Sequence, residues 1–189
     1  MPRVGVYPGS FNPPTTAHIA IANAARQQCG LDRVVLAHSH RVLGKGEVDR
    51  PLFRHRVEVL EAVARPHRWL EAIVTSAQLL VDIADGYDVV IMGADKWHQI
   101  QEVAWYDDEA HRDASIARLP EIVVAPRHPL IVPAEVRLSL PTHVIHGVSS
   151  TDARTGRVDL MAGAAREFAL RSGAWIDHDR YDEFVAGGG

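Results

Sequence analysis

Cysteine, long apolar runs and a surplus of positive charge are absent or scarce in this chain of 189 residues. The single cysteine, Cys29, excludes an internal disulfide, and its alanine-rich surroundings indicate a packed thiol rather than a nucleophile. No stretch approaches the roughly 20 apolar residues that a membrane-spanning helix needs, and no apolar leader follows a basic start. We therefore expect a cytoplasmic protein in a reducing compartment, with no membrane association.

The charge balance argues against a nucleic-acid partner. The formal net charge is -4, and acidic and basic side chains are interspersed along the chain. A nucleic-acid-binding protein usually presents a basic face, which this pattern does not supply. An anionic substrate must therefore be held by a few well-placed groups rather than by a general positive field.

Two common nucleotide-binding motifs and a recognisable metal site are also missing. No Gly-x-Gly-x-x-Gly occurs, and Gly44-Lys45-Gly46 lacks the flanking spacing of a P-loop. His38 and His40 would share one face of a strand, but no third ligand accompanies them at a recognised spacing. We expect no protein-bound metal.

Short apolar runs alternate with helical patterns along the chain, which favours an α/β fold. Such an alternation predicts right-handed crossovers and a doubly wound parallel sheet with helices on both faces. We expect one domain over residues 1–186 and a frayed tail at 187–189. The predicted strands are residues 4–7, 32–37, 69–74, 87–92, 120–125 and 140–145. The predicted helices begin at Thr15 or Thr16 and end at Gly30, then cover 51–64, with Arg56 on the polar side, 75–84, 107–118 and 160–171.

The first candidate site is the turn between the first strand and the first helix. Gly9 and the prolines after it force a tight non-helical turn before the alanine-rich helix. The free N–H groups and the dipole of a helix N-terminus favour an anion, and phosphate is the obvious one. Thr15 and His18 are three residues apart, so both can face the same phosphate. The alternative is an ordinary turn with a capping threonine and a surface histidine.

The second and third candidate sites also follow predicted strands. Gly93 ends the clearest strand, where a ligand can approach the backbone, and Asp95 can accept hydrogen bonds from ribose hydroxyls. In the segment 148–154, Ser and Thr side chains can cap a helix, and Arg154 supplies a cationic fork on the same face. The alternative for this last segment is a plain helix start with a solvated arginine. All three sites should meet at the carboxyl edge of the sheet, where open parallel sheets bind ligands.

These segments resemble the nucleotidyltransferase superfamily with the (His/Thr)-x-Gly-His signature, whose fold is Rossmann-like. The resemblance rests on Gly9-Ser10-Phe11-x-Pro13-x-Thr15-x-x-His18, on Gly93-x-Asp95 followed by Trp105-Tyr106, and on Val148-Ser149-Ser150-Thr151-x-x-Arg154. It is strongest for nicotinate/nicotinamide mononucleotide adenylyltransferases. Ala17 departs from the pattern, because many members carry glycine there. Trp97 is more consistent with a core anchor.

The resemblance implies roles for particular residues. The catalytic residues would be His18, Thr15 and Arg154. ATP would also contact Gly9, Ser10, Phe11, Gly93, Asp95, Ser149, Ser150 and Thr151, with the ribose at Asp95. The pyridine mononucleotide would contact Lys45, Trp105, Tyr106 and Arg127, and Arg41 is the alternative to Lys45 for its phosphate. A solvated basic loop at Lys45 and a surface ion pair at Arg127 are the competing interpretations. Mg²⁺ would arrive on the ATP phosphates, since no carboxylate cluster is evident.

The implied reaction is attack by the phosphate of a pyridine mononucleotide on the α-phosphorus of ATP, which releases pyrophosphate and forms a dinucleotide for NAD biosynthesis. Likeness of the Trp105-Tyr106 pair to bacterial enzymes favours nicotinate mononucleotide over nicotinamide mononucleotide. Two alternatives stay open: an adenylyl- or cytidylyltransferase for another phosphorylated acceptor such as phosphopantetheine, and a nonenzymatic nucleotide sensor. A class I aminoacyl-tRNA synthetase is disfavoured by chain length and by the lack of a Lys-Met-Ser-Lys-like loop. The sequence is compatible with a homo-oligomer and does not fix the oligomeric state.

Overall fold

The computed structural model describes residues 1–39, 50–142, 144 and 148–189. Within them, the strands are β1 (Val4–Gly9), β2 (Arg33–Ser39), β3 (Leu70–Thr75), β4 (Val89–Gly93) and β5 (Glu121–Ala125). The helices are α1 (Thr16–Gln28), α2 (Phe53–Ala64), α3 (Leu80–Ile83), α4 (Ala94–Gln99), α5 (Glu109–Ala117), α7 (Ser150–Arg154), α8 (Gly163–Ser172) and α9 (His178–Ala186). Short 3₁₀ turns lie at Val103–Trp105, Ala134–Val136 and Val158–Leu160.

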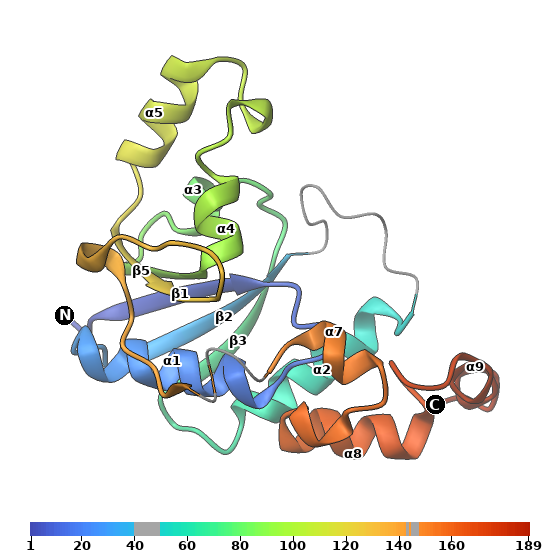
Figure 1. The fold of residues 1–189 in the computed structure, drawn as a ribbon. Coiled ribbons are helices and arrows are strands. Elements are labelled where there is room, and N and C mark those ends of the chain that lie inside the picture. Colours follow the sequence, from blue (N-terminus) through green and yellow to red (C-terminus); the bar gives the residue numbers. More distant parts are fainter. Residues whose placement is uncertain (40–49, 143, 145–147) are drawn as a thin grey trace.

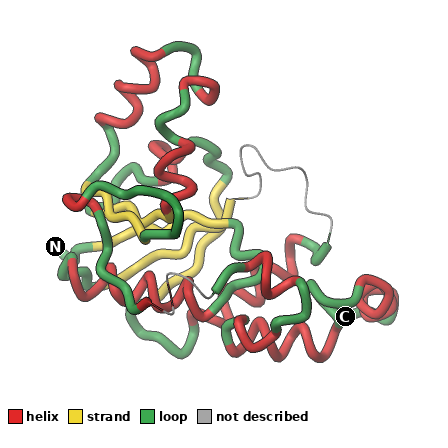
Figure 2. The backbone as a smooth tube through the Cα atoms, in the orientation of Figure 1, coloured by secondary structure: helices red, strands yellow, loops and turns green. Residues whose placement is uncertain are grey.

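The strands form one parallel sheet in the order β3-β2-β1-β4-β5. The chain adds β2 and β3 on one side of β1 and then returns to add β4 and β5 on the other, so the sheet is doubly wound as predicted. Val6 of β1 pairs with Val35 of β2 and with Val90 of β4. Figures 1 and 2 show α1, α2 and α8 on one side of the sheet and α3 and α4 on the other.

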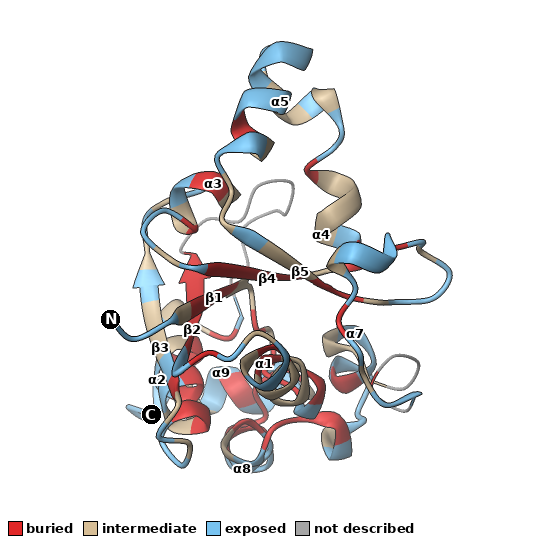
Figure 3. Cartoon of the chain, turned by 90° about the vertical axis from the view of Figure 1, so that its left-hand side faces the viewer, coloured by how far each residue is buried: buried red, intermediate tan, exposed pale blue. Residues whose placement is uncertain are grey.

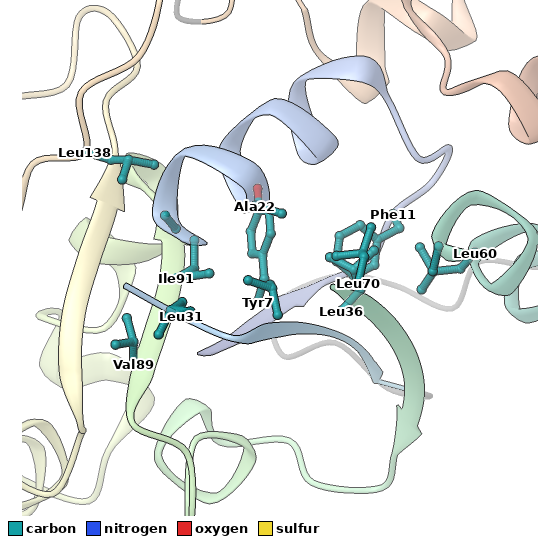
Figure 4. Packing of buried hydrophobic residues seen from close by; sticks show 13 residues of the cluster. Tyr7, Phe11, Ala22, Leu31, Leu36, Leu60, Leu70, Val89, Ile91 and Leu138 are labelled. Atoms are coloured by element: carbon teal, nitrogen blue, oxygen red, sulfur yellow. The ribbon is translucent and has the colours of Figure 1, made fainter. Parts of the chain in front are cut away.

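Two apolar clusters bury the two faces of the sheet. Tyr7 points toward α1 and packs with Leu36 and Ile91 in the first cluster, as Figure 4 shows. Val6 points the opposite way, into a cluster with Val90 and residues of α4. Because strands of a parallel sheet are covered on both faces, their residues are apolar in near-continuous runs rather than in alternation. Figure 3 shows this burial along β1 and β2.

A third cluster joins the C-terminal segment to the domain. It contains Phe168 of α8, Trp175 between α8 and α9, and Tyr181 of α9, which pack with Val59 and Val63 of α2. The Tyr181 hydroxyl accepts a hydrogen bond from the Leu52 N–H and lies 2.6 Å from Nδ1 of the buried His55. The tail at 187–189 hydrogen-bonds to carbonyls of α9, and its fraying stays a prediction.

The predicted strand at 140–145 is wrong. Leu140 and Pro141 lie in irregular structure, and Thr142 and Val144 are helical. Shortly before this run, Arg137 forms an isolated β-bridge with Val124 of β5. Within the predicted run, Leu140 packs against the cluster beneath α1, and Val144 is buried. Burial by packing, rather than by strand pairing, therefore explains the apolar run.

Three other expectations need correction. The helix predicted at 75–84 is only α3, because Thr75 ends β3 and its hydroxyl accepts the Ala77 N–H over 3.1 Å. Arg56, expected on the polar side of α2, is buried with 7% of its surface exposed, and its guanidinium lies over the Phe53 ring. Leu160 belongs to a 3₁₀ turn, and α8 begins at Gly163.

Among the residues that the structure describes, no helix has the length and apolar character needed to cross a bilayer.

Candidate functional site

The three segments singled out in the sequence meet in one cleft at the carboxyl edge of the sheet. The cleft has a volume of about 550 Å³, which is the size of a small-molecule site. Its walls come from the end of β1 and the start of α1, from the ends of β4 and β5, and from α7. The sequence-predicted residues that line it are Gly9, Ser10, Phe11, Thr15, His18, Gly93, Asp95, Arg127, Ser149, Ser150, Thr151 and Arg154.

Thr15 and His18 form the N-terminal cap of α1. The Thr15 N–H donates to Nδ1 of His18 over 2.9 Å, and the Thr15 hydroxyl lies 2.8 Å from the same nitrogen. A nitrogen that accepts an N–H hydrogen bond carries no proton, so in a neutral ring the proton is on Nε2. His18 lines the cleft, and Nε2 is thus the nitrogen that can donate to a ligand.

Aromatic neighbours keep His18 neutral. Its ring centroid lies 5.1 Å from that of Phe11 and 6.1 Å from that of Tyr7. The ring is only partly exposed, and burial lowers the pKa of His18 to about 4. At neutral pH the imidazole is therefore a neutral hydrogen-bond donor. Burial also raises the pKa of the neighbouring Tyr7, so its hydroxyl stays protonated.

The turn after β1 is folded tightly on itself. Phe11 is 2% exposed and has φ of 42°, in the left-handed region that non-glycine residues rarely adopt. A Cβ on Gly9 would lie 2.8 Å from Cζ of the Phe11 ring. The turn therefore needs glycine at this position, because any larger residue would displace Phe11 from beside His18.

Asp95 and Arg127 contact each other. Asp95 lies in the first turn of α4, and Arg127 follows β5. Nη1 of Arg127 donates to Oδ2 of Asp95 over 2.6 Å, and both side chains remain more than half exposed. An exposed ion pair contributes little stability, so a ligand can replace it at small cost.

The third segment is bonded directly to the first. Ser149 caps α7 by accepting the Asp152 N–H over 3.0 Å. The Ser150 hydroxyl donates to the Pro13 carbonyl over 2.9 Å. Arg154 donates from Nη1 to the Asn12 carbonyl over 2.5 Å and from Nη2 to the Thr151 hydroxyl over 3.2 Å. The predicted capping role is confirmed for Ser149. Arg154 is exposed, and its guanidinium is anchored to the turn through the Asn12 carbonyl.

Trp105 and Tyr106 lie beside the cleft rather than in it. They line a small pocket of about 40 Å³ that shares Gln78, Lys96 and Gln99 with the walls of the cleft. Nε1 of Trp105 donates to Glu102 over 3.2 Å, and the Tyr106 hydroxyl donates to the Ile100 carbonyl over 3.0 Å. As expected, Trp97 packs against the core, on the α4 side of the sheet.

Three residues considered in the sequence lie outside the described part of the chain, and two residues of the cleft wall were not predicted. Lys45, its alternative Arg41, and His40 lie outside the described residues. Lys96 and Gln99 line the cleft and bond to each other over 2.6 Å, yet no motif marks them. The signal that could have found Lys96 is its place next to Asp95, in the first turn of a helix that follows a strand.

Carboxylates are scarce around the cleft. In the described part of the chain, no group of three His, Cys, Asp or Glu side chains is placed to hold a metal ion. Of the described residues that line the cleft, Asp95 alone carries a carboxylate, and Arg127 contacts it. His38 is buried and stacks on Phe53, with Nδ1 3.3 Å from the Gly9 carbonyl.

A doubly wound parallel sheet is combined here with a histidine that caps one helix and an arginine from a second helix, both on one cleft. This arrangement is typical of nucleotide-binding α/β proteins. A family model described as cytidylyltransferase-like matches residues 6–156, which include all three cleft segments. The chain belongs to this cytidylyltransferase-like family.

Bacterial relatives carry a more specific name. A probable nicotinate-nucleotide adenylyltransferase of Bacillus pumilus is 32% identical over an alignment that covers 54% of this chain and 65% of the relative. A probable nicotinate-nucleotide adenylyltransferase of Streptococcus mutans is 31% identical over an alignment that covers 53% of this chain and 57% of the relative. A third, of Gloeobacter violaceus, is 48% identical over 33 residues, which make up 18% of this chain and 16% of the relative. The chain thus matches less than two thirds of the length of these relatives.

Proposed function

We propose that this protein transfers the adenylyl group of ATP to a pyridine mononucleotide, with nicotinate mononucleotide favoured. The observation that carries the proposal is the meeting of His18, Asp95 and Arg154 on one cleft. The names of the bacterial relatives support the choice of reaction and acceptor. The family to which the chain belongs supports nucleotidyl transfer as the class of chemistry.

The proposed step needs no protein nucleophile. A phosphate oxygen of the mononucleotide attacks the α-phosphorus of ATP, and the bond to the bridging oxygen breaks as pyrophosphate leaves. Such transfers are accelerated by alignment and by stabilisation of charge on the phosphoryl oxygens. Mg²⁺ would accompany the ATP phosphates as part of the substrate.

His18 would stabilise the α-phosphate. Its neutral ring has Nδ1 occupied by Thr15, so Nε2–H can donate to a phosphoryl oxygen as charge develops there. A neutral donor of this kind needs no prior deprotonation and stays effective across neutral pH. The Gly9 turn and Ser10 would position the same phosphate with backbone N–H groups.

Arg154 would bind the departing end of the triphosphate. Its guanidinium uses one N–H on the Asn12 carbonyl and one on the Thr151 hydroxyl, which leaves further N–H groups for phosphate oxygens. Arg154 can then hold ATP without releasing the turn. Ser149 and Ser150 would add hydrogen bonds at the start of α7.

The acceptor would occupy the side of the cleft near Trp105. The pocket lined by Trp105 and Tyr106 adjoins the cleft, and an indole face suits stacking on a flat pyridine ring. Arg127 would exchange Asp95 for the acceptor, which frees the Asp95 carboxylate to accept hydrogen bonds from ribose hydroxyls. Lys45 is proposed as a contact for the acceptor phosphate.

The test is pyrophosphate release with ATP and Mg²⁺, with nicotinate mononucleotide, nicotinamide mononucleotide and phosphopantetheine compared side by side. We expect release with the pyridine nucleotides and faster turnover with the nicotinate form. Release with phosphopantetheine alone would show that the acceptor is phosphopantetheine and not a pyridine mononucleotide. ATP binding with no release for any acceptor would contradict an enzymatic role and favour a nucleotide sensor.

A further inference from the structure

The turn at residues 12–14 is held by donors from the C-terminal part of the chain. Arg154 and Ser150 donate to the carbonyls of Asn12 and Pro13, and the Ala162 N–H donates to the Pro14 carbonyl over 3.0 Å. These contacts fix three consecutive carbonyls of the turn that carries Phe11 and precedes Thr15. The position of the turn is therefore set from outside its own strand and helix.

Trp175 makes the most distant of these contacts. Its indole Nε1–H donates to Oδ1 of Asn12 over 2.5 Å, across 163 residues of sequence. Asn12 thus accepts from Trp175 through its side chain and from Arg154 through its backbone. A displacement of Asn12 would move the carbonyl that orients the Arg154 guanidinium.

The backbone at Trp175 is unusual for a residue that only fills the core. Its φ is 68°, in the left-handed region, although the residue is neither glycine nor asparagine. The indole is buried, with 6% exposed, and meets the Phe168 ring edge to face at 6.0 Å. Strain of this kind persists where the surroundings hold a residue in place, and it is more frequent at functional sites.

We propose that Trp175 is a positioning residue of the nucleotide site, which acts through Asn12 on Arg154 and on the Phe11 turn. The assignment of Arg154 to ATP rests on the proposed function. The indole N–H keeps Asn12 in place, Asn12 keeps Arg154 aimed across the start of α7, and the turn keeps Phe11 against His18. The C-terminal segment thereby takes part in the alignment of the phosphates although it contributes no wall to the cleft.

The competing explanation is that Trp175 only packs the core with Phe168. Trp175→Phe separates the two, because it keeps an aromatic ring and removes the N–H donor. Trp69→Phe is the matched control: Trp69 is a partly buried indole at the opposite end of the sheet, packed under Arg26. A packing role predicts a lower melting temperature and no change in the kinetic constants of the folded protein.

The experiment measures kcat, both KM values and ATP affinity for wild type, Trp175→Phe, Asn12→Ala, the double variant and Trp69→Phe. We expect Trp175→Phe to lower kcat/KM for ATP about tenfold, since small misplacements of positioning groups have large kinetic effects. The acceptor KM should change less than about twofold, because the Trp105 pocket is untouched. The double variant should be no worse than Asn12→Ala, since both changes break the same bond.

ATP affinity from calorimetry separates this proposal from the proposed function. About fivefold weaker ATP binding by Trp175→Phe, with unchanged binding by Trp69→Phe, supports the positioning role even if no acceptor yields pyrophosphate, because one hydrogen bond is worth about 1 kcal/mol. If the wild type releases no pyrophosphate with any acceptor, only the proposed reaction is overturned. Equal kcat/KM and equal ATP affinity for Trp175→Phe and wild type would overturn the positioning role.

Discussion

The Thr15 N–H donates to Nδ1 of His18 over 2.9 Å, so one hydrogen bond both caps α1 and selects the tautomer of the histidine on the cleft. A cap satisfies a backbone donor at the helix start, and here the acceptor is the ring of the third helical residue. The same bond that stabilises the helix leaves Nε2 protonated. Local structure and proposed catalysis therefore share a single contact.

We expect His18→Ala to lower kcat by about a hundredfold or more, because one donor to a developing charge is lost. The fold should persist, since the change removes a cap rather than a core side chain. Pyrophosphate release gives the rate, and circular dichroism checks the fold. The exposed His178, in the first turn of α9, supplies the control His178→Ala, which should retain full activity. Turnover like that of the wild type in His18→Ala would remove His18 from the mechanism.

The pKa of His18, lowered by burial to about 4 from an ordinary 6.5, predicts a pH dependence of stability. Between these two values the unfolded chain binds a proton that the folded chain does not. The free energy of unfolding should therefore fall as the pH drops from about 6.5 to about 4, by up to about 1.4 kcal/mol per pH unit, and should be insensitive to His18 above that window. Denaturant titrations of wild type and His18→Ala across pH 4 to 8 measure the difference. Parallel stability curves for the two proteins would contradict the lowered pKa.

Arg154→Ala should chiefly weaken ATP. We expect ATP affinity to fall about tenfold, because a charge-assisted contact to phosphate is lost. The control is Arg157→Ala, since Arg157 is exposed and paired with Asp159 outside the cleft. Calorimetry with ATP and thermal melts should be run on the same samples. Lower stability with unchanged ATP affinity would assign Arg154 a structural role at the Asn12 carbonyl instead.

Trp105→Ala should raise the acceptor KM about fivefold and leave ATP affinity unchanged, since an aromatic stacking pair is worth about 1 kcal/mol. Trp105→Phe keeps a flat ring and should restore most of the loss. Initial rates at varied mononucleotide and fixed saturating ATP measure the effect. An equal change in both substrates would place Trp105 outside the acceptor site.

Gly9→Ala should lower kcat about tenfold or more, because the new Cβ would lie 2.8 Å from the Phe11 ring and displace it from its place beside His18. The matched control is Gly163→Ala at the start of α8, where a Cβ meets no atom within 4 Å. Both variants carry the same chemical change, so the comparison isolates the turn. Retained activity in Gly9→Ala would show that the turn tolerates a displaced Phe11.

Much of the fold could be predicted because its signals are local. The buried strand from Val89 and the helix after Thr15 follow from apolar runs and capping residues that lie within a few positions of one another. The run at 140–145 was wrongly predicted as a strand, because apolar character records burial and not the partner that buries the residue. Arg56 was predicted on the polar side of α2 for a related reason: a charged side chain predicts exposure, whereas here it is buried and packs on Phe53.

The chain by itself determines the parallel α/β design, the turn around Gly9 and the caps at Thr15 and Ser149, because these depend on backbone freedom and on neighbours along the chain. Folding in three dimensions determines which side chains meet. Arg127 donates to the Asp95 carboxylate, Arg154 donates to the Asn12 carbonyl, and Trp175 donates to the Asn12 side chain. These partners lie 32, 142 and 163 residues apart, so no local pattern encodes them. Arg154 and Trp175 reach Asn12 because the C-terminal segment packs against the turn, and Asp95 meets Arg127 because β4 and β5 are neighbours in the sheet.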